Sequence, residues 1–123
     1  MDITPMMTKR TGLARVLFAT YYSMKGLRAA FLTEAAFRQE LLALAILIPV
    51  ALSLDITNVE RVLLIWSLCM VIIVELLNTA IEKLCDHIST DMHELLGRAK
   101  DIGSAAVFIC LLLAAFTWLI ILL

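Results

Sequence analysis

Three long apolar segments dominate this chain of 123 residues and determine the solvent in which it folds. Residues 62–81 and 102–123 each match the ~20 residues that an α-helix needs to cross a bilayer. The segment 41–54 reaches that length only when its flanking residues are included. A soluble domain of this size has too little interior for a composition that is 63% apolar. The sequence therefore predicts an all-α membrane protein, a single domain over residues 1–123, with transmembrane helices at 37–56, 62–81 and 102–123.

The placement of basic residues predicts the orientation of these helices. Most lysines and arginines precede the first span or lie between the second and third, whereas Arg61 is the only basic residue of the first connection. No basic residue follows the third span. Because basic loops stay in the cytoplasm, we expect the N-terminus and the 82–101 loop to be cytoplasmic and the C-terminus to lie on the other side. The first residues also lack the apolar core of a cleaved signal peptide.

A further helix is expected over residues 12–33, ahead of the spans. It carries too much charge to cross a bilayer, and a largely apolar stripe recurs at spacings of three and four: Leu13, Val16, Leu17, Thr20, Met24, Leu27 and Phe31. This pattern is typical of an amphipathic helix lying in the membrane interface. The simplest alternative role is a lipid anchor whose Arg15 contacts phospholipid phosphate.

A stripe of polar residues interrupts the second span. Its members are spaced to share one face of one helix: Glu75, Asn78, Glu82 and Asp86. Glu75 would lie about 10 Å below the cytoplasmic end of the span. An ionised acid at the bilayer centre costs about 2.5–3.5 kcal/mol, so we expect Glu75 to face a polar interior, where it could accept a proton. A purely structural acid that bonds Asn78 or a neighbouring helix remains the alternative.

Other charged residues are expected at the same membrane level. Glu34 and Arg38 lie at the junction between the N-terminal helix and the first span, and Lys100 and Asp101 stand where the third span begins. Carboxylates such as Glu34, Glu82 and Asp86 suit Mg²⁺, which keeps several waters that substrate phosphates can replace. Lys100 and Arg15 could neutralise phosphate charge. Taken alone, Glu34 and Arg38 could equally be an ordinary surface pair.

Several chemistries are excluded by absent motifs. With four glycines, the chain contains neither a phosphate-binding loop nor a dinucleotide fingerprint. His93-Glu94 begins like a zinc-protease helix, but Gly97 stands where the second histidine is required. We therefore expect no zinc site here, and we expect His87 and His93 to lie in loops at the level of the lipid headgroups. The three cysteines have no metal or disulfide spacing. With 17% charged residues and a net charge of -1, the composition does not indicate nucleic-acid binding.

Two sequence blocks carry a family resemblance. Residues 75–82 read E-L-L-N-T-A-I-E, and residues 91–106 read D-M-H-E-L-L-G-R-A-K-D-I-G-S-A-A. Together with G-L-R-A-A at 26–30 and E-A-A-F-R-Q-E at 34–40, they closely resemble the prokaryotic diacylglycerol kinases, small integral-membrane kinases of Gram-negative inner membranes. The resemblance runs from about residue 12 to the C-terminus.

The resemblance implies a homotrimer with active sites shared between subunits. It would transfer the γ-phosphate of ATP, with Mg²⁺, to the primary hydroxyl of diacylglycerol and so form phosphatidic acid. Glu75 would be the general base and Asn78 would support the catalytic carboxylate. Glu34 and Glu82 would hold the metal. ATP would contact Arg15, Tyr22, Glu34, Glu82, Asp91, Met92, His93, Lys100 and Asp101.

The resemblance also implies a set of lipid contacts, which begins in the N-terminal helix and ends at the C-terminus. Its members are Arg15, Ala19, Thr20, Tyr21, Tyr22, Ser23, Met24, Arg28, Ala29, Ala30, Phe31, Ala36, Phe37, Arg38, Gln39, Glu40, Ser53, Leu54, Asp55, Ile56, Arg61, Glu75, Ser104, Trp118, Leu119, Ile120, Ile121, Leu122 and Leu123.

Three alternatives to this function remain open at this point. A kinase acting on another lipid alcohol, such as undecaprenol, would have similar spans. A small proton- or ion-conducting subunit would explain an intramembrane acid such as Glu75, but it would leave Glu34, Glu82, Lys100 and Asp101 without a role. A membrane adaptor without catalytic activity would leave the whole acidic stripe unexplained.

Overall fold

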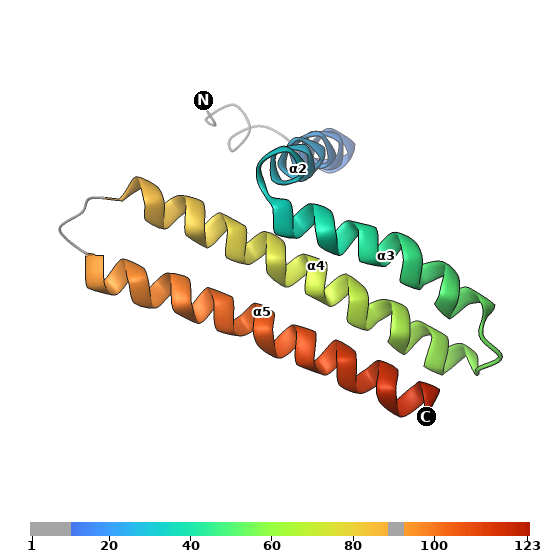
Figure 1. The fold of residues 1–123 in the computed structure, drawn as a ribbon. Coiled ribbons are helices and arrows are strands. Elements are labelled where there is room, and N and C mark those ends of the chain that lie inside the picture. Colours follow the sequence, from blue (N-terminus) through green and yellow to red (C-terminus); the bar gives the residue numbers. More distant parts are fainter. Residues whose placement is uncertain (1–10, 89–92) are drawn as a thin grey trace. The chain divides into compact units, whose positions relative to one another are not determined.

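The computed structural model describes residues 11–88 and 93–123, and within these ranges the regular structure is entirely α-helical. The helices are α2 (Gly12–Thr33), α3 (Ala35–Ser53), α4 (Asn58–His87) and α5 (His93–Leu122) (Figure 1). Three of them, α3, α4 and α5, are long and apolar enough to cross a membrane. The predicted all-α class with three candidate spans is confirmed.

Helix α4 is the centre of the unit that runs from Glu34 to Leu123. It packs against α3 on one side and α5 on the other, with the larger contact made to α5 (Figure 1). The small core of this unit is formed by apolar residues from all three helices: Phe37, Ala51, Leu64, Leu68, Val71 and Ala114. Because α4 is held from both sides, the residues on its inward face are fixed by their neighbours.

Most apolar side chains of α5 are exposed. Phe108, Phe116 and Ile120 are 60%, 62% and 64% exposed. An apolar surface of this extent is not stable in water and marks contact with lipid or with other protein surfaces. The exposure therefore agrees with a membrane protein, and it leaves room for further subunits around the helices.

The connection between α3 and α4 is fixed by side chains. Thr57 and Glu60 form a capping box at the start of α4, in which each side chain accepts a hydrogen bond from the other residue's backbone N–H. Arg61 donates to the carbonyl oxygens of Ala51, Leu52 and Ile56, at the end of α3 and just beyond it. Carbonyl oxygens at the end of a helix lack partners within the helix, and Arg61 supplies hydrogen-bond donors to these three.

Helix α2 belongs to a separate unit that ends at Thr33. Its hydroxyl side chains bond back onto their own helix: Thr20 donates to the Val16 carbonyl at 2.9 Å and Ser23 to the Ala19 carbonyl at 2.8 Å. These groups are thus satisfied without water, which suits a helix in contact with lipid. Its position in the membrane interface stays a prediction.

Helices α4 and α5 continue well beyond the apolar spans expected from the sequence. Helix α4 covers Asn58–His87 against the expected 62–81, and α5 begins at His93 instead of residue 102. The expectation that His87 and His93 lie in loops is wrong, because they are the last residue of α4 and the first residue of α5. The lengths of the apolar segments predict where the helices can cross a membrane. They do not predict the polar turns by which the same helices continue beyond the apolar segments.

Candidate active site

The polar stripe of α4 runs from a buried end to an exposed end. Glu75 and Asn78 are each only 8% exposed, although they are polar and lie on a helix apolar enough to span a membrane. Glu82, the next member, is half-buried, and Asp86 is exposed. The stripe thus leads from the interior of the helical unit to its surface within one helix face.

Asn78 links two members of this stripe. Its amide nitrogen Nδ2 donates a hydrogen bond to Glu82 Oε1 at 3.2 Å. The resemblance implies that Asn78 supports the catalytic carboxylate, whereas this bond goes to Glu82, the expected metal ligand. Asn78 therefore fixes the orientation of the Glu82 carboxylate in this structure.

Three further carboxylates lie near Glu75. Glu34 and Glu82 are both close enough to Glu75 to interact with it electrostatically, and so is Glu40 from the first turns of α3. The Glu40 Oε2 atom is buried and has no hydrogen-bond partner among the residues that the structure describes. From the sequence, Glu40 was expected only among the lipid contacts, because residue spacing along the chain does not show which residues of α3 lie near α4. A cation bound here would offset the mutual repulsion of these acids.

Lys83 is a site residue that the sequence analysis missed. Its Nζ lies 3.2 Å from Glu34 Oε1, which joins the end of α4 to the start of α3. Lys83 follows Glu82 directly and so lies off the polar stripe, and a search along one helix face does not find it. Its amine provides positive charge next to an expected metal ligand.

The exposed end of the stripe meets the start of α5. Lys100 Nζ forms an ion pair with Asp86 Oδ1 at 2.9 Å, and Lys100 also interacts electrostatically with Glu82. A cleft of about 280 Å³ lies here between the two helices, lined by Asp86, His93 and Lys100 among others. Of the residues expected to contact ATP, this places Glu82, His93 and Lys100 in one region, with the exposed Asp101 next to Lys100. Asp91 and Met92 lie outside the described residues.

Arg15 and Tyr22 are two turns apart on α2, which is described by itself. The Tyr22 ring packs edge-on against Tyr21 with centroids 5.3 Å apart. Lys25 Nζ lies 5.6 Å from the Tyr21 ring centroid and 5.8 Å from that of Tyr22. Lys25, which was not among the expected site residues, thus adds a cation to this aromatic pair.

The expected lipid contacts are not gathered at one place. Residues 19–24 and 28–31 lie on α2, while residues 36–40 form the start of α3 near Glu75. Residues 53–56, Arg61 and residues 118–123 lie at the opposite end of α3, α4 and α5 (Figure 1). The two ends of α3 are about 28 Å apart at helical rise. Ser104 is exposed on α5, next to the helix contact at Asn78.

The donor set around Glu82 fits Mg²⁺. This ion is commonly bound by one or two carboxylates, with substrate phosphates and water completing its coordination. Glu34 and Glu82 both lie near Glu75, and the described residues contain no group of three or more side chains placed to hold a metal ion by themselves. A closed metal cage would need such a cluster, whereas a metal carried in with a nucleotide would not.

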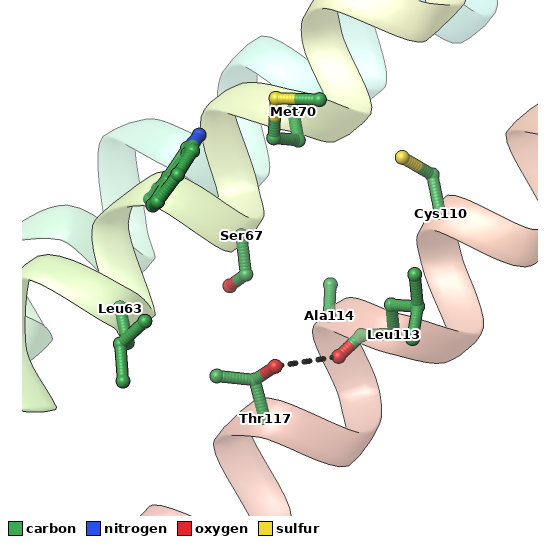
Figure 2. Close-up of a pocket in the computed structure, with 8 residues that line it drawn as sticks. Leu63, Ser67, Met70, Cys110, Leu113, Ala114 and Thr117 are labelled. Carbon is green, nitrogen blue, oxygen red and sulfur yellow. Dashed lines mark hydrogen bonds between the residues drawn. The ribbon is translucent and has the colours of Figure 1, made fainter.

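A second groove between α4 and α5 has a different character. It measures about 270 Å³ and is lined by Leu63, Trp66 and Leu113 with smaller side chains between them (Figure 2). Ser67 donates to the Leu64 carbonyl at 2.7 Å, and Thr117 donates to the Leu113 carbonyl at 2.8 Å, the bond drawn in Figure 2. Since both hydroxyls are satisfied within their own helices, the groove offers mainly apolar contact.

The chain is similar to diacylglycerol kinases over most of its length. Residues 21–122 match the sequence profile of the prokaryotic diacylglycerol kinase family. A diacylglycerol kinase from Escherichia coli (strain K12) is 51% identical over 117 residues, which cover 95% of this chain and 96% of the relative. One from Haemophilus influenzae is 47% identical, with coverage of 91% and 95%, and one from Helicobacter pylori (strain J99) is 37% identical, with coverage of 89% and 86%. The chain belongs to the prokaryotic diacylglycerol kinase family.

Proposed function

We propose that this protein is a diacylglycerol kinase that transfers the γ-phosphate of ATP to the primary hydroxyl of diacylglycerol and forms phosphatidic acid. The observation that carries the proposal is the stripe on α4, where the buried Glu75 is followed by Glu82 toward the surface. This arrangement suits a reaction between a substrate in the membrane and one in the cytoplasm. Membership of the kinase family supports it.

In this proposal Glu75 is the general base. The lipid hydroxyl oxygen attacks the γ-phosphorus, its proton passes to a Glu75 carboxylate oxygen, and the bond to the β-phosphate oxygen breaks to release ADP. Phosphoryl transfer requires alignment and neutralisation of charge more than covalent chemistry by the protein. The buried position of Glu75 restricts its reaction partner to an alcohol delivered from the membrane.

Glu34 and Glu82 would hold Mg²⁺, with Asn78 orienting Glu82. The metal would supply positive charge at the phosphates when it is bound with ATP. Lys100 would neutralise phosphate charge at the cleft near Asp86, and Arg15, Tyr22, His93 and Asp101 complete the proposed nucleotide contacts. Lys100 would exchange its ion pair with Asp86 for a phosphate, because a phosphate offers more negative charge.

A homotrimer in the bacterial inner membrane is part of the same proposal. The exposed apolar surface of α5 is compatible with contacts to lipid and to other copies. The N-terminus and the 82–101 segment would face the cytoplasm, where ATP is available, and the C-terminus would face the periplasm. Active sites shared between subunits would enclose ATP more completely than one chain can.

The acceptor distinguishes the proposal from its nearest alternative. The full-length protein is purified in mixed micelles with radiolabelled ATP and either diacylglycerol or undecaprenol. We expect labelled phosphatidic acid to form much faster than labelled undecaprenyl phosphate. Faster labelling of undecaprenol would reassign the acceptor, and proton flux through protein-containing liposomes without ATP would favour the ion-conducting alternative.

Replacement of Lys83 by Met is expected to strengthen metal binding. The change removes a cation that competes for Glu34, so the Mg²⁺ concentration for half-maximal kinase activity should fall by about two- to fivefold, the range that corresponds to the usual strength of an ion pair near a protein surface. The measurement is a Mg²⁺ titration at saturating ATP and diacylglycerol. Arg98→Met, which removes an exposed ion pair with Glu94 on α5, is the matched control. An increased Mg²⁺ requirement in the Lys83 variant would show that Lys83 assists the site instead of competing in it.

A further inference from the structure

The tightest described approach of a glycine to another helix occurs at Gly103 on α5. Gly103 is buried, and a Cβ atom placed on it would overlap Asn78 Oδ1. The same atom would lie 3.4 Å from Asn78 Cγ and 3.7 Å from Ile81 Cδ1. At Gly26 and Gly97, by contrast, an added Cβ would meet nothing within 4 Å. Only Gly103, among the glycines of the described residues, is required by its surroundings to lack a side chain.

The chemistry of the Asn78 amide determines which of its ends faces Gly103. A carboxylate accepts hydrogen bonds and cannot donate them, so the amide nitrogen of Asn78 must face Glu82, as the 3.2 Å bond requires. The oxygen Oδ1 then points at the Gly103 backbone. It is buried and has no hydrogen-bond partner among the described residues. Asn78 is therefore held between Glu82 on one side and the bare backbone of α5 on the other.

We propose that Gly103 is a positioning residue, which sets the Glu82 carboxylate for metal binding by giving Asn78 the space to donate to it. The inference rests on the proposed role of Glu82 as a metal ligand. A side chain at position 103 would displace the amide of Asn78, and Glu82 would lose the donor that fixes its orientation. Partners that orient a metal ligand typically contribute about 10–100-fold to metal affinity or activity.

Helix propensity and the proposed role of Gly103 predict opposite effects of a Gly103→Ala substitution. Alanine is a better helix former than glycine, so Gly→Ala inside an unobstructed helix stabilises the folded state. Gly26→Ala should do this on α2, because the space around Gly26 is open. Gly103→Ala should instead weaken metal binding even though it improves the intrinsic propensity of α5.

The test measures binding of Mn²⁺, used as a paramagnetic probe, to the full-length protein with a non-hydrolysable ATP analogue. Gly103→Ala is expected to raise the dissociation constant of Mn²⁺ by about tenfold. Ala106→Leu adds bulk to an exposed position one turn further along α5 and should leave this constant unchanged. In an Asn78→Ala background the oxygen that meets the new methyl group is gone, so Gly103→Ala should cause no further loss.

Glu82→Gln separates the failure of this inference from the failure of the proposed function. If Glu82→Gln weakens Mn²⁺ binding and Gly103→Ala does not, Glu82 keeps its role and the positioning role of Gly103 is refuted. If Glu82→Gln leaves Mn²⁺ binding unchanged, the metal role of Glu82 is refuted and the inference falls with it. An equal loss from Gly103→Ala with and without Asn78 would indicate a general packing defect and would also overturn the inference.

Discussion

Replacement of Glu75 by Gln is expected to lower the rate of diacylglycerol phosphorylation by about 10²–10⁴-fold, the usual contribution of a general base. Glutamine keeps the shape of the side chain and fits the same buried position, but it does not accept the proton of the lipid hydroxyl. The measurement is initial-rate transfer of labelled phosphate from ATP to diacylglycerol in mixed micelles.

The interpretation requires that the Glu75→Gln protein still folds and binds nucleotide. We expect its unfolding transition in detergent and its affinity for an ATP analogue to remain close to those of the parent. Glu94→Gln is the matched control, because Glu94 lies on α5 with its side chain 83% exposed. A Glu75→Gln protein that retains a rate within a factor of two would remove Glu75 from the role of base.

Replacement of Glu82 by Gln should have the second large effect, on the metal. Loss of a group that only orients a metal ligand lowers metal affinity or activity by about 10–100-fold. The Glu82→Gln change removes the charged ligand itself and should have a larger effect. We therefore expect the Mg²⁺ concentration for half-maximal activity to rise at least about 100-fold. A Mg²⁺ titration at fixed total ATP, corrected for the ATP–metal complex, measures this shift.

Asp86 provides a control for the Glu82→Gln variant. Asp86 lies one turn beyond Glu82 on the same face of α4 and is exposed, with its oxygen engaged by Lys100. Asp86→Asn should change the Mg²⁺ requirement much less than Glu82→Gln does. Equal shifts for the two variants would mean that the metal binds through the general negative charge of this helix end.

The transmembrane part of the fold is predictable from the sequence because it depends on a one-dimensional property. The lengths of the apolar segments identify three helices able to cross a membrane, and the structure contains them. Their ends are less predictable, since polar turns such as the start of α5 at His93 continue a helix without adding apolar length. The capping box at Thr57 marks one helix start locally, through the spacing of Thr57 and Glu60.

The candidate site is predictable only as far as it lies on one helix. Spacing relates Glu75, Asn78 and Glu82, because residues three, four and seven apart share a face. It cannot relate Lys83 to Glu34 or Glu40 to Glu75, because these pairs join α4 to α3. The close approach of Gly103 to Asn78 is a contact between α5 and α4, and residue spacing does not predict it either. Contacts between helices therefore required the three-dimensional structure.

The most direct test of the account is an experimental structure of the oligomer with Mg²⁺, a non-hydrolysable ATP analogue and a short-chain diacylglycerol. We predict that a Glu75 carboxylate oxygen lies within about 3.2 Å of the primary hydroxyl of the lipid, the reach required of a general base. The γ-phosphate should lie beside the same hydroxyl, with the metal on Glu82. A Glu75 side chain packed against acyl chains and remote from the triphosphate would contradict the account.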